Sequence, residues 1–288
     1  RVFFMGGAAV EPEKVLSAPE PADLDEYWTE LLGRLAEVPV TAKRISVPCE
    51  DEKVNVYAVE VACAGPRPVT GYLTMPADAS KTKRYPVIAA IRGASWSAQV
   101  APKTGPADRI RMEINGNGFD LGRDDGYYAE FFKAIKTGGR DYGLNPALNR
   151  ERDTTYFNGM ALRAMRFLQY LKTLPEWDGR ALDLKCGSQG AFQALLAAAR
   201  VPGVTSITLY APWGLDWSGV NAGRKLVSTF RPEWQSALEY YNLCHAAKRI
   251  RCPVDISQAG LGDYISPPSS IAVLYNSLAC PKSVTWRQ

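Results

Sequence analysis

A serine in a turn of small residues is the strongest candidate for chemistry in this sequence. Residues 187–190 read Gly-Ser-Gln-Gly; an apolar alternating run at 181–186, typical of a buried strand, precedes them, and an Ala/Leu-rich run at 191–200, typical of a helix, follows. This order of elements is the setting of a nucleophile elbow, which holds a serine hydroxyl beside free backbone N–H groups. Ser188 is therefore a candidate nucleophile, although Cys186 replaces the first glycine of the usual G-x-S-x-G pattern. A plain turn between two elements is the alternative.

A carboxylate follows this serine along the chain, as the order nucleophile, acid, base of a triad on such a sheet requires. Asp263 closes a Gly-Leu-Gly-Asp turn directly after an apolar run at 252–258 that predicts a late strand. At that place it would orient a base that accepts the proton of Ser188. The alternative for Asp263 is a helix N-cap or an Asx-turn ahead of the prolines at 267–268.

Two backbone N–H groups are candidates for stabilising the oxyanion that forms when Ser188 attacks a carbonyl group. One is the N–H of Gln189, at the start of the predicted helix. The other lies in the loop after the near-continuous apolar run 85–91, a predicted parallel strand, and is most simply that of Ala94. A plain turn is again the alternative, but the strand ends taken together favour catalysis.

The base of the triad is the missing part. The sequence contains one histidine, His245, which precedes Asp263 and falls in a predicted helix at 232–247, so we interpret it as a helix-surface or capping residue. The base is expected in the loop after the last predicted strand, and the sequence ends there, at Gln288. We therefore expect the triad histidine just after Gln288; the alternative is a protein without one.

The elements that must position these residues alternate along the chain. Asp23 is predicted to cap a helix that runs to about Glu37 and has an apolar face, and Asp153 is predicted to cap a second helix that runs through Leu174. Three short alternating runs predict an antiparallel meander, and they occupy residues 45–47, 54–61 and 69–73. Later strands alternate with helices, which indicates an α/β fold with a mostly parallel central sheet, antiparallel N-terminal edge strands and helices on both faces. Ligands of such sheets bind beyond the carboxyl ends of the strands.

Composition bounds the classes of function. The 288 residues are 46% hydrophobic and 22% charged with a net charge of +4, which is ordinary for one large domain. Scattered charges speak against nucleic acid as a partner, and no apolar run approaches the roughly 18 residues that span a membrane. The six cysteines are far apart, which favours free thiols over disulfides and speaks against a zinc site; they are Cys49, Cys63, Cys186, Cys244, Cys252 and Cys280. No metal or organic cofactor is indicated.

The N-terminal segment differs from the rest. Residues 1–10 begin in an apolar strand-like pattern, and prolines make the following stretch an extended linker. We interpret residues 1–22 as a linker or the remnant of an upstream domain, and residues 23–288 as one domain whose C-terminal catalytic loop is missing.

With these residues in hand, the sequence resembles the acetyl xylan esterase and cephalosporin-C deacetylase family of carbohydrate esterases, from Ala22 to its end. The matching stretches are 22–28 (Ala-Asp-Leu-Asp-Glu-Tyr-Trp), 85–88 (Tyr-Pro-Val-Ile), 152–157 (Arg-Asp-Thr-Thr-Tyr-Phe), 175–179 (Pro-Glu-Trp-Asp-Gly), 187–190, 260–263 and 267–270 (Pro-Pro-Ser-Ser). The resemblance implies an α/β-hydrolase fold, frequent oligomers and removal of acetyl groups from sugar hydroxyls. It implies Ser188 as nucleophile, Asp263 as acid and the N–H groups of Gln189 and Ala94 as oxyanion donors.

The sequence departs from the family pattern at several positions. Arg92 stands where a histidine is frequent, Ala94 replaces a tyrosine, and Cys186 and Ala191 replace glycines. A backbone donor does not depend on its side chain, so the change at Ala94 is tolerable. The segment 213–217 also differs from the usual sequence, which bears on the substrate.

These observations predict a two-step serine esterase that deacetylates acetylated xylan or xylo-oligosaccharides through an acyl-enzyme. Candidate sugar-stacking or pocket-wall residues are Trp96, Trp213, Trp217 and Tyr127, each with a place in the core as its alternative. Tyr127 lies in a long excursion at 119–152, and such insertions commonly form a binding wall or an oligomer contact. The other functional hypotheses are a catalytically silent carbohydrate-binding relative without the histidine and a serine peptidase of the same fold. A polysaccharide substrate would favour a secreted or periplasmic protein.

Overall fold

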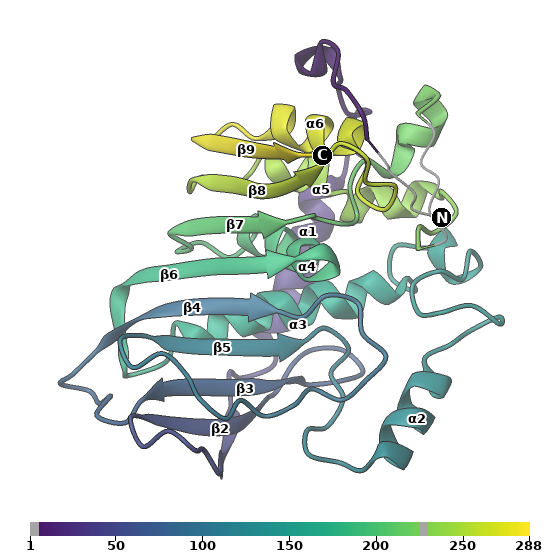
Figure 1. Ribbon diagram of the computed structural model, residues 1–288. Helices are drawn as coiled ribbons and strands as arrows, with labels where there is room; N and C mark the ends of the chain where they lie inside the picture. The colour runs from purple at the N-terminus through teal and green to yellow at the C-terminus, as the bar shows by residue number, and fades with distance from the viewer. Residues whose placement is uncertain (1–5, 225–229) are drawn as a thin grey trace, which may run out of the picture.

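A single nine-stranded sheet carries the fold in the computed structural model, which describes residues 6–224 and 230–288 (Figure 1). The strands are β1 (Ala42–Val47), β2 (Val54–Val61), β3 (Val69–Pro76), β4 (Tyr85–Ile91), β5 (Ile110–Asn115), β6 (Trp177–Gly187), β7 (Ser206–Tyr210), β8 (Val254–Gly260) and β9 (Lys282–Arg287). Their order across the sheet is β1-β2-β3-β5-β4-β6-β7-β8-β9. The pairs among β1, β2, β3 and β5 are antiparallel, and every pair from β5 through β4 to β9 is parallel. The predicted α/β fold with antiparallel edge strands is confirmed.

Burial explains the sequence patterns of the strands. β2, which lies between the edge strand β1 and β3, has buried residues that alternate with more exposed ones near its two ends, whereas every residue of β3 is buried. In β4, Val87, Ala89 and Ile91 point into the core. The near-continuous apolar run at 85–91 is therefore a parallel strand, as predicted.

Apart from α2 (Asp125–Ala134), the α-helices of the described residues form a layer on one face of the sheet. The others are α1 (Leu24–Ala36), α3 (Tyr156–Leu171), α4 (Ser188–Ala198), α5 (Leu243–Ala247) and α6 (Pro268–Ser277), with 3₁₀ turns η1 (Pro12–Lys14), η2 (Leu148–Arg150), η3 (Trp217–Ala222) and η4 (Ser236–Tyr241). In Figure 1, α1, α3 and α4 lie behind the strands, and α2 stands apart beyond the strand ends.

The expectation of helices on both faces differs from what the structure shows, for a topological reason. The connections from β5 to β6, β7, β8 and β9 all progress in one direction across the sheet, so right-handed crossovers place α3, α4, α5 and α6 on one face. Only the crossover from β4 to β5 progresses the other way. That crossover, residues 92–109, contains no helix.

Three predictions about the helices also differ from the structure. The second predicted helix is α3, which has Thr155 rather than Asp153 at its N-cap position and ends at Leu171. The helix expected at 232–247 is split into η4 and α5, because Asn242 has an extended backbone and its side chain accepts the N–H of Cys244 as an N-cap. Asp23 precedes α1 but makes no capping hydrogen bond. Its carboxylate instead accepts hydrogen bonds from Arg152 and Tyr240, so it joins α1 to the segment before α3.

The N-terminal segment packs along α6. Of the strand-like stretch expected at 1–10, residues 1–5 lie outside the described residues, and residues 6–10 form no strand. The amide of Asn276, in α6, donates to the carbonyl oxygens of Pro12 and Val15 at 2.7 and 2.9 Å. All six cysteines belong to the described residues and are free thiols. Among the helices of those residues, none is long and apolar enough to cross a membrane.

Candidate active site

The serine turn has the backbone strain of a nucleophile elbow. Ser188 joins β6 to α4 with φ 51°, in the left-handed region that residues with a β-carbon rarely adopt. Two residues later, a β-carbon on Gly190 would stand 1.9 Å from the carbonyl oxygen of Ile91, so only glycine fits where α4 begins against the end of β4. The side chain of Cys186, at the first position of the motif, is buried, and burial raises the pKa of its thiol to about 12. It is therefore a neutral core residue and not a second nucleophile.

A pocket of about 200 Å³ opens at the serine, beyond the carboxyl ends of the parallel strands. Five of the residues predicted from the sequence line it; they are Ala94, Trp96, Ser188, Gln189 and Trp213. The others are Asp141, Tyr142, Leu144, Phe230 and Ile265. Loops after β4, β6, β7 and β8 thus meet at one place, as the topology requires.

Two of the residues that line this pocket, Gln189 and Ala94, are the oxyanion donors predicted from the sequence. Among the described residues, neither the N–H of Gln189 nor that of Ala94 makes a hydrogen bond. Gln189 is the second residue of α4, where first-turn N–H groups have no partner within the helix. A β-carbon on Gly93 would lie 3.5 Å from the β-carbon of Ser188, so the loop that carries Ala94 passes directly beside the serine. Two N–H groups placed beside a serine hydroxyl in this way could stabilise an oxyanion.

The carboxylate of Asp263 lies in a turn on the same edge of the sheet. Its Oδ1 accepts the N–H groups of Ile265 and Ser266 at 2.7 and 3.0 Å, which is the Asx-turn geometry that the sequence allowed. In the described residues its Oδ2 makes no hydrogen bond, so one oxygen stays available to a base.

The loop after β7 contacts both turns. The N–H of Trp213 donates to the carbonyl oxygen of Ser188 at 3.2 Å. The hydroxyl of Ser266 donates to the carbonyl oxygen of Ala211, also at 3.2 Å. The turns of Ser188 and Asp263 therefore flank one short segment. Asp263 itself does not line the pocket, whereas Ile265 beside it does.

Two of the four predicted aromatic substrate contacts lie elsewhere. Trp217 is 1% exposed, because its indole packs between the rings of Phe157 and Trp213 and donates to the carbonyl oxygen of Tyr241. Tyr127 lies on α2, where its hydroxyl accepts the N–H of Asp120. Trp217 is therefore a core residue, whereas Tyr127 is only partly buried against the core, and neither lines the pocket.

Sequence reasoning missed the pocket residues of the long excursion. Residues 119–152 do supply a wall of the site, but through Asp141, Tyr142 and Leu144 rather than through Tyr127. The aromatic residues that follow Tyr127 in this excursion, Tyr128, Phe131 and Phe132, pack on Phe119 instead. The length of the excursion was the only signal that pointed to the wall itself.

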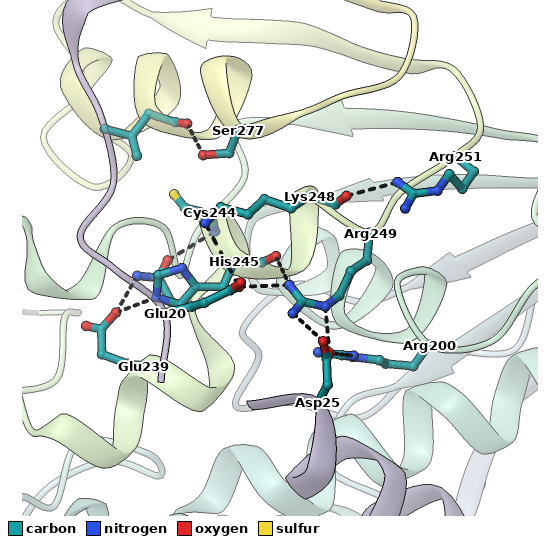
Figure 2. Close-up of polar contacts among 12 residues, drawn as sticks. Glu20, Asp25, Arg200, Glu239, Cys244, His245, Lys248, Arg249, Arg251 and Ser277 are labelled. Carbon is teal, nitrogen blue, oxygen red and sulfur yellow. Dashed lines mark hydrogen bonds and ion pairs between the residues drawn. The ribbon is translucent and has the colours of Figure 1, made fainter. Parts of the chain in front are cut away.

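His245 is buried and engaged, so its interpretation as a surface residue is wrong. Its side chain is 1% exposed and its Nε2 lies 3.0 Å from Oε2 of Glu239, as Figure 2 shows. The same carboxylate accepts the side-chain N–H groups of Asn242 and Trp234. The main-chain oxygen of His245 accepts a hydrogen bond from Arg249, which also binds Asp25 on α1. This is a structural cluster away from the pocket, and His245 does not line the pocket of Ser188.

No metal centre accompanies the pocket within residues 6–224 and 230–288, where no three His, Cys, Asp or Glu side chains come together as a metal site would need.

Residues 14–287 match the family described as acetyl xylan esterase (AXE1). The acetyl esterase Axe7A of Xylanibacter ruminicola is 28% identical over 282 residues, which cover 91% of this chain and 61% of that protein. The chain thus spans about three fifths of the length of this curated relative.

Two solved structures share the fold. Acetyl xylan esterase 1 from Thermoanaerobacterium sp. JW/SL YS485 has a TM-score of 0.76 and 18% identity, with 96% of this chain and 91% of that chain covered. The acetyl xylan esterase from Paenibacillus sp. R4 has a TM-score of 0.79 and 18% identity, with 96% and 92% covered. These likenesses show an α/β-hydrolase fold.

Proposed function

We propose, from the premise that this chain belongs to the acetyl xylan esterase family, that it is a serine carbohydrate esterase that removes acetyl groups from acetylated xylan or xylo-oligosaccharides. One observation carries the proposal: the strained Ser188 lines a pocket together with Gln189 and Ala94, whose N–H groups make no hydrogen bond within the described part of the chain. A hydroxyl nucleophile and two fixed donors are the parts that acyl transfer needs.

The reaction proceeds in two steps. The Oγ of Ser188 attacks the acetyl carbonyl carbon, and the resulting oxyanion accepts the N–H groups of Gln189 and Ala94. The intermediate collapses to an acetyl-serine as the sugar oxygen leaves with a proton. Water then attacks the acetyl-serine, and acetate leaves as Ser188 regains its proton.

Proton transfer in both steps needs a base, and His245 is unsuited to that role because it is buried against Glu239. We propose a histidine that follows Gln288, with its ring oriented by the available Oδ2 of Asp263. Trp96 and Trp213, which line the pocket, would contact the sugar.

Two alternatives have different outcomes in assays. The family match favours the esterase over a serine peptidase of the same fold. A silent relative that lacks the histidine would bind acetylated xylo-oligosaccharide but release no acetate.

The test assays the full protein with p-nitrophenyl acetate, acetylated xylan and a peptide p-nitroanilide, as wild type and as Ser188→Ala. Ser277→Ala is the control, since that hydroxyl donates to the carbonyl oxygen of Val273 within α6 and Ser277 does not line the pocket. We expect ester hydrolysis that Ser188→Ala abolishes and Ser277→Ala preserves, with no peptide cleavage. Ester turnover that survives Ser188→Ala would remove this serine from the mechanism.

A further inference from the structure

We propose that Tyr142 is a positioning residue whose hydroxyl fixes the two oxyanion-donor segments relative to each other. The proposal rests on the proposed function, because it assigns a role within the same site. Tyr142 lies in the excursion between β5 and α3, outside every sequence motif discussed above, and its ring lines the pocket.

The hydroxyl of Tyr142 joins the loops that follow two parallel strands. Its oxygen accepts the N–H of Ser95, after β4, at 3.3 Å. Its proton is donated to Oε1 of Gln189, after β6, at 3.2 Å. One hydroxyl is therefore the common partner of the loops that follow β4 and β6.

Of the two residues that Tyr142 binds, Ser95 is adjacent to the proposed donor Ala94, and Gln189 is itself a proposed donor. The N–H of Ser95 is occupied by Tyr142, which leaves the preceding N–H, that of Ala94, as the open donor of this loop. Gln189 is held through its side chain, while its own N–H stays open. Because oxyanion stabilisation depends on the placement of donors before the reaction, a tie between their segments acts on the transition state.

The phenol is suited to a permanent tie. Tyr142 is 4% exposed, and this burial raises its pKa to about 12, so it stays protonated and can donate throughout the neutral range. Its ring is confined between Trp96 and Tyr156, with centroid separations of 5.8 and 5.0 Å. Since its oxygen and its proton are both already engaged, Tyr142 takes no part in proton transfer itself.

The test replaces the hydroxyl alone, with Tyr142→Phe in the full protein. Tyr128→Phe is a matched control: its hydroxyl also accepts a backbone N–H, that of Arg123 at 3.2 Å, and donates to an oxygen, that of Asp120 at 3.0 Å. Tyr128 is 5% exposed and does not line the pocket. The two variants should therefore lower the melting temperature by similar amounts.

Activity should separate them. For Tyr142→Phe we expect kcat to fall by about tenfold or more, short of the roughly 100- to 1000-fold effect of losing a donor, with KM nearly unchanged. A boronic acid that forms a tetrahedral adduct with the serine should bind more weakly by the same factor, while acetate inhibition stays the same. Tyr128→Phe should leave all three quantities at their wild-type values.

A second variant tests the pathway through the glutamine. Gln189→Met keeps the backbone N–H but removes the acceptor of the Tyr142 proton, so it should reproduce part of the kcat loss. The double variant should lose less than the product of the two single losses. Wild-type kcat in Tyr142→Phe, or equal losses in Tyr142→Phe and Tyr128→Phe, would overturn the proposal. An inactive wild type would instead contradict the proposed function.

Discussion

The carbonyl oxygen of Ile91 occupies the space that a β-carbon on Gly190 would need, at a separation of 1.9 Å. This close approach presses the first turn of α4 against the end of β4. It sets the loop that carries Ala94 beside Ser188, so the geometry of the two proposed donors depends on Gly190, which does not itself line the pocket.

Replacing Gly190 with alanine should therefore damage both stability and activity. The atom in the way belongs to the backbone and cannot move aside as a side chain would, so α4 must shift. We expect a loss of about 1–3 kcal/mol in the free energy of unfolding, as for other overpacked sites, together with a fall in kcat.

Urea unfolding and ester hydrolysis measure the two effects of Gly190→Ala. Gly33→Ala in α1 is the control, because a β-carbon there has no neighbour within 4 Å. In a helix this change should add up to about 1 kcal/mol of stability and leave activity as it is. Equal behaviour of the two variants would mean that the contact with Ile91 does not constrain the turn.

Substituting Asp263 by asparagine should separate its structural role from its catalytic one. Asparagine keeps an oxygen that can accept the N–H groups of Ile265 and Ser266, so the turn and the melting temperature should be preserved. It removes the negative charge that would hold the base, and kcat should fall on the order of 10⁴-fold, as for the same change in another triad. Steady-state kinetics beside thermal unfolding measure this. A variant that unfolds at lower temperature but keeps its kcat would make Asp263 a turn residue only.

Replacing Trp96 should change substrate binding, whereas replacing Trp217 should change the stability of the fold. Trp96 lines the pocket and is 42% exposed, so Trp96→Ala should raise KM for acetylated xylo-oligosaccharides on the order of tenfold, about one aromatic contact. Its KM for p-nitrophenyl acetate should change little. Trp217→Ala removes a buried ring and should lower the free energy of unfolding by about 3–5 kcal/mol. Kinetics with both substrates and urea unfolding distinguish the two effects, and an unaltered oligosaccharide KM in Trp96→Ala would exclude this sugar contact.

The sequence predicted the parts of this protein that follow from local pattern. Strand periodicity and the turn at 187–190 located the sheet and Ser188, and the chain order of strands placed the loop of Ala94 at the same edge. Tyr142 escaped prediction because nothing local marks it; its role arises from hydrogen bonds to Ser95 and Gln189, each 47 residues away.

Two other failures have the same origin. The interpretation of Asp23 as a cap was local, whereas its carboxylate is engaged by Arg152, 129 residues away. That contact also joins two of the stretches that carry the family resemblance. The prediction of helices on the second face is wrong because the crossover at 92–109, which the strand order directs to that face, contains no helix. The strand order follows from long-range pairing and cannot be derived from the local sequence pattern.

The contact between Glu239 and His245 should make the free energy of unfolding depend on pH in the acidic range. Burial alone would raise the pKa of Glu239, but hydrogen bonds from His245, Asn242 and Trp234 outweigh it and lower this pKa below its ordinary value of 4.5. A carboxyl group whose pKa is lower in the folded state stabilises the protein above its unfolded pKa, and this contribution is lost as the pH falls through the folded pKa. Wild-type stability should therefore decline as the pH drops below about 4.5, the ordinary pKa of a glutamate side chain.

Glu239→Gln should be less stable at pH 7, since its amide group would face the donors of Asn242 and His245, and its stability should decline less steeply in acid. Urea unfolding between pH 7 and pH 3 compares the slopes, with Glu26→Gln, for which the structure gives no polar partner among the described residues, as the control. Parallel curves for wild type and Glu239→Gln would show that Glu239 does not titrate with folding.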